Sequence, residues 1–355
     1  MEKKRNSNFE LLRILAIVLI TLNHITTKGL TLDPSTGSLG NNALALLYSC
    51  GGKFGCILFL LITVWFLSDE KINWKRILMV WYQTFIYYFM FNVVFMLINH
   101  NFTLAGIVRF FLPIMNSNYW YSRCYIILLL FFPLTMKVFR LIPFKKTLLV
   151  LGAILLLLPV LFISRKNNDI FGMICKILRL PIVSFFYFAI LLYYIKNYVP
   201  YQRISSGVYI ASSIVLYAVM WFVVTIIFYR SGPYSCWRDL YSPFNYLSAF
   251  CLFLGFATPR SRYNKWINVI AAFSFDIYLF QCHEKIKPVL WNSVFPFDKW
   301  YGMNFWYFLF FTVMATAAIC AIGSVFALLY QHIFSKPMKY LLKKIDSYIN
   351  TRAMS

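Results

Sequence analysis

Charged side chains are scarce in this sequence. Asp, Glu, Lys and Arg make up 13% of its 355 residues, about half of their share in a typical soluble domain. No hydrophilic stretch is long enough to form a separate soluble domain. We therefore expect one membrane domain over residues 1–335, a short basic tail over 336–355, and no appended soluble enzyme module.

The signatures of several enzyme classes are also absent. The segment GGKFG at residues 51–55 lacks the Walker A spacing, and the sequence contains no HExxH or GxSxG motif. The eight cysteines stand singly, without a CxxC pair, so neither a zinc site nor a disulfide framework is indicated. These absences argue against an ATP-driven pump and a zinc protease, and we expect no metal.

Acidic residues are especially few, with 11 Asp and Glu against 34 Lys and Arg, which gives a net charge of +23. In a soluble protein this excess of positive charge would indicate nucleic-acid binding. In a membrane protein, basic residues gather in short cytoplasmic loops and determine the orientation of the chain. We therefore expect membrane lipid, and no nucleic acid, as a partner.

Hydrophobic residues dominate the chain at 61%, and aromatic residues reach 20%. A helix needs about 20 apolar residues to cross the hydrocarbon core. Apolar runs between breakers predict ten spanning helices, and hence an all-α polytopic bundle. The predicted spans are 9–28, 50–68, 77–98, 118–137, 147–164, 174–195, 207–229, 244–259, 267–284 and 304–332. The shorter segment 103–114 is predicted to be interfacial or re-entrant.

The distribution of Lys and Arg predicts the side that each loop faces. With the N-terminus inside, the loops assigned to the cytoplasm hold most of the basic residues, as the positive-inside rule requires. Both termini are then cytoplasmic, and the basic, amphipathic tail is suited to an anionic inner leaflet. The first apolar run contains Arg13 and lacks a small-residue cleavage site, so we interpret it as a retained helix.

The first predicted helix carries three ionisable residues, Glu10, Arg13 and His24. Ionisable residues within a membrane span are functional candidates. Helix geometry places Arg13 and His24 within ~20° of one face and ~16 Å apart along the axis, with Glu10 near the same face. Two simpler explanations stay open: Arg13 can snorkel to lipid headgroups, and His24 can be an inert interfacial histidine.

Together with three other segments, this arrangement resembles acyltransferase family 3, bacterial membrane enzymes that acylate glycans. The resemblance rests on the Arg-x10-His spacing, on NYWYSRCYIILLLFFP (118–133), on SFDIYLFQCHEKIKPVLW (274–291) and on the basic turn WKRILMVW (74–81). It extends over essentially the whole chain. It implies a location in the plasma (inner) membrane of a bacterium.

The resemblance implies an acyl-coenzyme A donor, usually acetyl-CoA from the cytoplasm, and an acceptor hydroxyl on an extracytoplasmic or lipid-linked glycan. It assigns Arg13 to the donor channel. It assigns His24 either as the general base on the acceptor hydroxyl or as the carrier of a transient acyl group. Such a reaction needs no metal.

Three further residues are candidates for binding the donor: Glu10, Lys75 and Arg76. Basic side chains at the cytoplasmic edge can bind the phosphates of coenzyme A. Lys75 and Arg76 can equally be ordinary positive-inside residues. The sequence also departs from the family pattern here, because Met79 stands where a second arginine is common.

The candidates for the acceptor or oxyanion site lie at the outer ends of the fourth and ninth spans. They are Trp120, Arg123, Tyr125, Tyr278, Gln281 and His283. A cation beside an aromatic wall can shape an acceptor site or stabilise an oxyanion. The simpler interpretation is an aromatic belt with an interfacial anchor and a polar helix end.

Two other functions stay open. A transporter or flippase for a lipid-linked sugar or small solute is also basic and polytopic, but it would show repeats and interrupted helices, and no repeat is evident. A glycan polymerase would carry a larger outer loop than the longest loops expected here, near 28–50 and 285–303. The sequence leaves the acceptor, the acyl group and the oligomeric state open.

Overall fold

The computed structural model describes residues 5–67, 69–100, 113, 119–163, 177, 180–232 and 236–353. Within these residues the regular structure is helical, without a strand, which confirms the all-α prediction. Six described helices are long and apolar enough to cross a membrane. They are α1 (Ser7–Lys28), α2 (Leu39–Trp65), α3 (Trp74–Asn99), α5 (Trp120–Arg140), α9 (Ser206–Ser231) and a run that begins with α15 (Phe305–Leu329).

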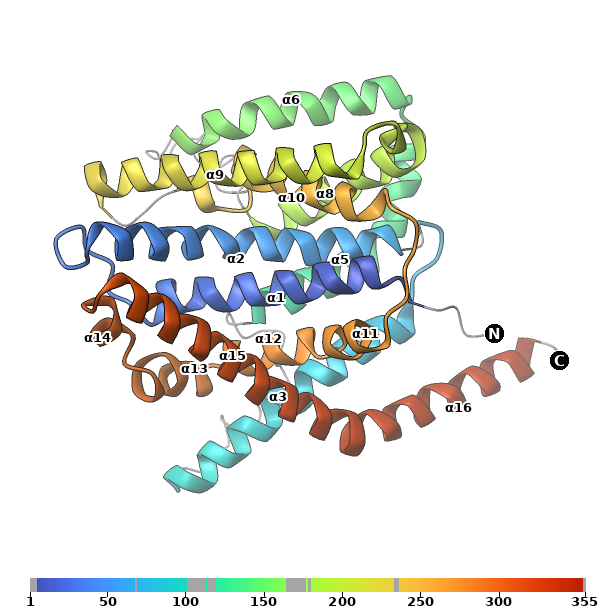
Figure 1. Cartoon of the computed structure of the whole chain (residues 1–355). Coiled ribbons are helices and arrows are strands. Elements are labelled where there is room, and N and C mark those ends of the chain that lie inside the picture. Colours follow the sequence, from blue (N-terminus) through green and yellow to red (C-terminus); the bar gives the residue numbers. More distant parts are fainter. Residues whose placement is uncertain are drawn as a thin grey trace.

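Shorter helices complete the bundle, in which α1 and α2 lie near the centre (Figure 1). Their bounds are α6 (Phe144–Ile163), α8 (Pro181–Tyr198), α10 (Pro243–Ala257), α11 (Lys265–Ala271), α12 (Ser274–Cys282), α13 (Ile286–Pro288), α14 (Phe297–Tyr301) and α16 (Ser335–Ala353). A π-helical turn at Tyr330–Phe334 joins α15 to α16, which leaves the bundle at an angle. Apart from Pro113, the predicted segment 103–114 lies outside the described residues.

The second span begins eleven residues earlier than predicted, at Leu39 instead of residue 50. Ser38 caps this helix by accepting a hydrogen bond from the backbone of Asn41. The Asn41 side chain donates to the carbonyl oxygens of Tyr301 (2.8 Å) and Met303 (2.7 Å). Because these carbonyls accept from the amide nitrogen of Asn41, a polar residue can enter the helix. The expected long loop near 28–50 is therefore wrong.

The ninth span is also different from the prediction, because it is broken into α11 and α12 at residues 272–273. Ser274 and Asp276 follow the break directly, and Asp276 accepts a hydrogen bond of 2.6 Å from Gln83 of α3. Irregular backbone at membrane depth is tolerated where it borders protein or a cavity instead of lipid. The interruption therefore lies beside a polar site.

Small residues bring α1 and α2 into close contact. A Cβ atom at Gly52 would lie 2.3 Å from Asn23 Oδ1, and one at Gly55 would lie 2.6 Å from the carbonyl oxygen of Ala16. Asn23 also donates a hydrogen bond of 2.7 Å to the carbonyl of Ser49. Small residues at helix interfaces allow this approach in membranes. The packing fixes which face of α1 turns toward the rest of the bundle.

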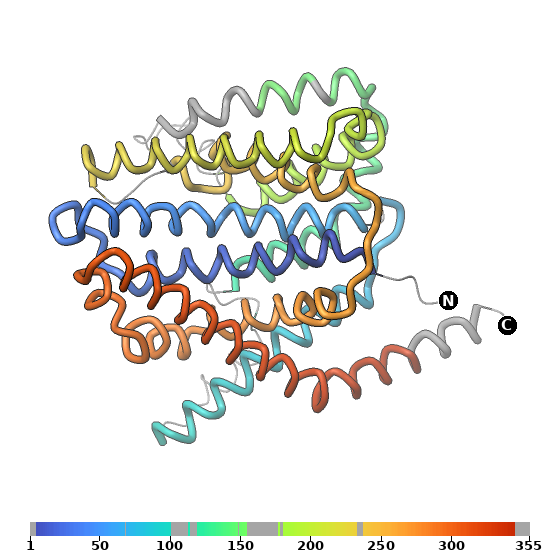
Figure 2. Tube along the Cα trace, in the orientation of Figure 1, coloured from blue at the N-terminus to red at the C-terminus, as the bar shows by residue number. Residues whose placement is uncertain are grey.

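Loops predicted to be cytoplasmic meet at one end of the bundle. Near the end of α8, Lys196 Nζ donates a hydrogen bond of 2.7 Å to the carbonyl of Trp65, at the end of α2. From the two ends of the described chain, Arg5 and Lys339 line the same cavity. The first and last described segments therefore lie on the same side of the bundle (Figure 2).

Candidate active site

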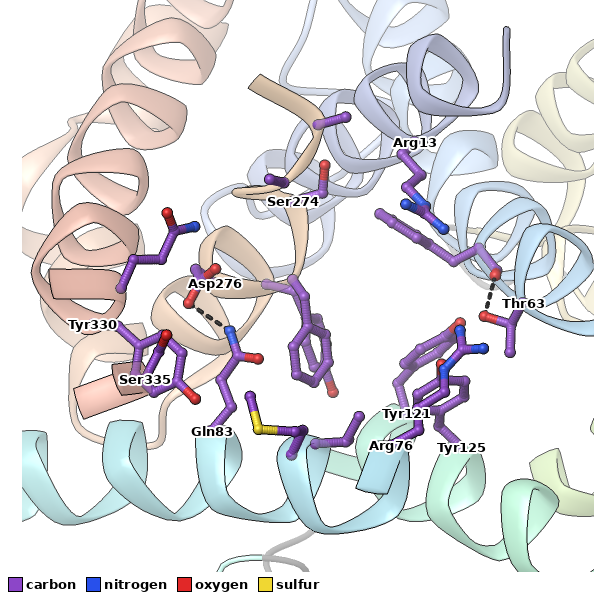
Figure 3. Close-up of a pocket in the computed structure, with 18 of the residues that line it drawn as sticks. Arg13, Thr63, Arg76, Gln83, Tyr121, Tyr125, Ser274, Asp276, Tyr330 and Ser335 are labelled. Atoms are coloured by element: carbon purple, nitrogen blue, oxygen red, sulfur yellow. Dashed lines mark hydrogen bonds between the residues drawn. The ribbon is translucent and has the colours of Figure 1, made fainter. Parts of the chain in front are cut away.

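A cavity of about 490 Å³ opens between the helices at this end of the bundle (Figure 3). Its wall is formed by α1, α2, α3, α5, the region around the α11–α12 break, and the turn between α15 and α16. Four basic side chains line it, from positions far apart in the sequence: Arg5, Arg13, Arg76 and Lys339. Such a concave site with convergent cations is suited to a polyanionic ligand.

Arg13 is held in the cavity wall by Glu10. The guanidinium Nη1 lies 2.8 Å and 2.9 Å from the two carboxylate oxygens of Glu10, one turn earlier on α1. Glu10 is buried, whereas Arg13 is partly exposed to the cavity. Glu10 does not itself line the cavity. A buried carboxylate thus orients the guanidinium and offsets the cost of placing its charge within a membrane span.

The second arginine comes from α3. Arg76 lines the cavity, and its guanidinium carbon lies 5.6 Å from the centre of the Tyr125 ring, within the range of a cation–π interaction. Tyr121 stacks against Tyr125, so Arg13, Arg76 and two tyrosines gather on one side of the cavity (Figure 3). The neighbouring Lys75 is exposed and does not line the cavity.

The opposite side of the cavity carries Asp276, a residue to which sequence analysis gave no role. Asp276 is 2% exposed, and its carboxylate accepts the hydrogen bond from Gln83, with Tyr330 and Ser335 nearby in the wall (Figure 3). The signal was present in the sequence, since an acid within the apolar run SFDIYLF is itself a functional candidate. The cavity is therefore cationic on one side and carries a carboxylate on the other.

The cavity approaches His24 without reaching it. Its wall on α1 ends at Ile20, one turn and about 6 Å of helix rise before His24. Because α1 is continuous from Ser7 to Lys28, Arg13 and His24 share the predicted face. One face of α1 therefore carries an arginine that lines the cavity and, about 16 Å further along the axis, a histidine that lies beyond the cavity wall.

His24 is surrounded by polar and aromatic side chains from other elements. The Trp291 ring lies 5.8 Å from the imidazole, tilted by 69°, and Gln281 lies beside the imidazole. Apart from this mutual contact, His24 Nδ1 and the two polar atoms of the Gln281 amide have no hydrogen-bond partner among the described residues. The structure thus brings together two predicted site residues, His24 and Gln281. Both side chains can form further hydrogen bonds.

Lys53 is a second residue that sequence analysis missed. Its Nζ lies 4.2 Å from the centre of the Trp120 ring, in a cation–π arrangement. It also acts electrostatically on His24, together with Lys28 and Lys287. The predicted start of the second span at residue 50 placed Lys53 at the membrane edge. The actual start at Leu39 moves it to the middle of α2.

The remaining predicted residues are dispersed. Tyr125 and Tyr278, predicted on the acceptor side, line the same cavity as Arg13, whereas Arg123 is half-buried and does not line it. His283 is buried among the rings of α3 and Tyr119. Its Nε2 lies 3.3 Å from the Asn92 amide nitrogen, and its Nδ1 accepts from the backbone of Lys285 (3.2 Å). Protein groups therefore occupy both ring nitrogens.

Comparison with protein families identifies the class of protein to which this chain belongs. The model of the acyltransferase domain of acyltransferase family 3 matches residues 6–324. The chain therefore belongs to this family of membrane acyltransferases. The match ends before the turn at Tyr330–Phe334 and before α16, which complete the cavity wall. Comparison with curated proteins and with solved structures gives no match.

Proposed function

We propose that the protein is an O-acetyltransferase that moves an acetyl group from cytoplasmic acetyl-CoA to a hydroxyl of an extracytoplasmic or lipid-linked glycan. One observation carries the proposal: a cavity lined by four basic side chains extends along α1 as far as Ile20, one turn before His24. Coenzyme A carries its phosphates at one end and its thioester at the other. A cavity that is cationic at one end and ends near a histidine base suits that molecule.

The proposed orientation follows from the same geometry. Acetyl-CoA is made in the cytoplasm, so the cationic mouth, both chain termini and the basic loops face inward in the proposed arrangement. The positive-inside rule supports this orientation, since those loops hold most of the Lys and Arg. His24 then lies toward the outer side of the plasma membrane of a bacterium, where an exported glycan is accessible.

In the proposed reaction, His24 removes the proton from the acceptor hydroxyl while the oxygen attacks the thioester carbonyl. The tetrahedral intermediate collapses, the C–S bond breaks, and coenzyme A leaves as a thiol after taking up a proton. The buried Gln281 amide can donate to the oxyanion or to the acceptor. In a two-step variant, His24 itself carries the acetyl group before the hydroxyl receives it.

The test is acetyl transfer from radiolabelled acetyl-CoA by the purified protein in proteoliposomes with envelope glycan. We expect label on the glycan, or released as acetate, and its loss in His24→Ala. His332→Ala is the matched control, because His332 is exposed in the π-helical turn after α15 and does not line the cavity. Transfer that persists in folded His24→Ala would refute the proposal.

The break between α11 and α12 favours a second candidate, a transporter or flippase, because interrupted helices at a central site are typical of transporters. That candidate predicts movement of a lipid-linked sugar or small solute across vesicles without any acyl donor. Solute movement that needs no acetyl-CoA and survives His24→Ala would support it. Acetyl transfer without such movement would exclude it.

A further inference from the structure

Positive charge converges on His24 from three separate elements. Lys28 lies one turn after His24 on α1. Lys53 follows Gly52 of α2, which packs against Asn23, the neighbour of His24. Lys287 of α13 lies four residues before Trp291, whose ring contacts His24. Bringing like charges together at a partly buried site costs free energy. A bound anion would offset that cost.

A second observation at the same place points to a ligand. Gln281 is 0% exposed, yet its amide nitrogen and oxygen have no hydrogen-bond partner other than the neighbouring imidazole of His24 among the described residues. His24 Nδ1 is buried and unpartnered in the same way. Buried polar atoms are nearly always hydrogen-bonded, and leaving one unpaired costs roughly 1–3 kcal/mol. These atoms are therefore available to a bound molecule.

The phosphates of the proposed donor do not explain these lysines. The proposed donor cations line the cavity together with Arg13, and helix rise separates Arg13 from His24 by about 16 Å. None of the three lysines near His24 lines that cavity. The charge around His24 therefore has a different ligand, and the other molecule that must reach this base is the acceptor.

We propose that the acceptor is an anionic saccharide, with a phosphate or a carboxylate close to the hydroxyl that is acylated. The inference rests on the proposed function and names the substrate class of the same site. The anion lies among Lys28, Lys53 and Lys287 while the hydroxyl meets His24 and Gln281. The Trp291 ring beside His24 offers an apolar face against which a sugar ring can pack.

The experiment compares acceptors of one ring and different charge: methyl glucoside, methyl glucuronoside and glucose 1-phosphate. The full-length protein in proteoliposomes receives radiolabelled acetyl-CoA, and KM and kcat are measured for each acceptor. We expect at least about tenfold lower KM for the anionic sugars, which corresponds to one or two charge-assisted contacts. The carboxylate and phosphate arms show which anion the site prefers.

Binding is measured separately, so that the result does not depend on turnover. Diethyl pyrocarbonate modifies unprotonated imidazoles, and peptide mass spectrometry reports the rate of modification at His24. The anionic sugars should slow this rate and the neutral sugar should not. Equal protection by all three sugars, or protection by none, would overturn the inference.

Lysine variants separate an acceptor site from a general effect on the base. Lys28→Gln and Lys287→Gln should each weaken the preference for anionic acceptors by about fivefold, the most expected for one partly exposed pair. Lys285→Gln is the matched control, because Lys285 acts on His283. If the lysines only tune His24, these variants should change kcat equally for charged and neutral acceptors, which would also overturn the inference.

Failure of the inference and failure of the proposed function give different results. Acetyl transfer that depends on His24 but ignores acceptor charge would leave the function standing and remove the anionic acceptor. Protection of His24 by anionic sugars without any acetyl transfer would leave the anion site standing and remove the acetyltransferase.

Discussion

Gly55 of α2 lies so close to Ala16 of α1 that a Cβ at Gly55 would sit 2.6 Å from the Ala16 carbonyl oxygen. The obstructing atom belongs to the backbone, so it cannot move away as a flexible side chain would. This contact sets the distance between the helix that carries Arg13 and His24 and the helix that carries Lys53. The geometry of the site therefore depends on a residue without a side chain.

We expect Gly55→Ala to destabilise the protein by about 1–3 kcal/mol, the usual cost of overpacking. Gly152→Ala on α6 is the control, since its Cβ would meet nothing within 4 Å and alanine favours a helix over glycine. Thermal unfolding in detergent, followed by size-exclusion profiles, measures both variants. Equal stability of the two variants would show that α1 and α2 can separate without cost.

Glu10 is expected to act on donor binding through Arg13. Glu10→Gln removes the charge that holds the guanidinium in the cavity wall, so KM for acetyl-CoA should rise about tenfold with little change in kcat. Glu70→Gln is the matched control, because Glu70 is exposed and does not line the cavity. A fall in kcat at unchanged KM would instead assign Arg13 to the chemical step.

Lys339 is expected to help bind the donor, although it lies beyond the residues that match the family. Lys339→Gln should raise KM for acetyl-CoA about two- to fivefold, as one exposed charge pair allows. The difference should shrink at high ionic strength. Lys343→Gln, one turn further along α16 and outside the cavity wall, should have no effect. Equal effects of both variants would indicate membrane attachment instead of donor binding.

Helix positions that depend on local sequence could be predicted well. The first span was placed within two residues of α1, and the shared face of Arg13 and His24 followed from helix geometry alone. Both results need only a continuous apolar run, which is a local property. Gln281 was a candidate for a different reason, because it belongs to a polar cluster at the end of the ninth predicted span, in a segment that resembles the family.

Features that depend on tertiary partners could not be predicted. The start of α2 was missed because the amide nitrogen of Asn41 finds its acceptors, the carbonyls of Tyr301 and Met303, only in the folded bundle. The break before α12 was missed because the run 267–284 is apolar enough to continue as one helix. Lys53 was overlooked because the predicted start of the second span at residue 50 placed it at the membrane edge.

Trp120 provides a test of the role of Lys53. The Trp120 ring lies under the Lys53 ammonium at 4.2 Å, and a cation–π contact of this kind is worth about 0.5–2 kcal/mol. Trp120→Phe keeps an aromatic face and should retain most of the acetyl transfer. Trp120→Leu removes that face, so the lysine loses its position near His24, and transfer should fall about 2- to 30-fold.

The control for this pair is Trp306→Leu on α15, because Trp306 is largely exposed and should tolerate the same change. Transfer rates for the three variants are compared at matched amounts of folded protein. A normal rate in Trp120→Leu would mean that Lys53 needs no aromatic support. Equal losses in Trp120→Phe and Trp120→Leu would mean that the indole acts through its size or its N–H group and not through its π face.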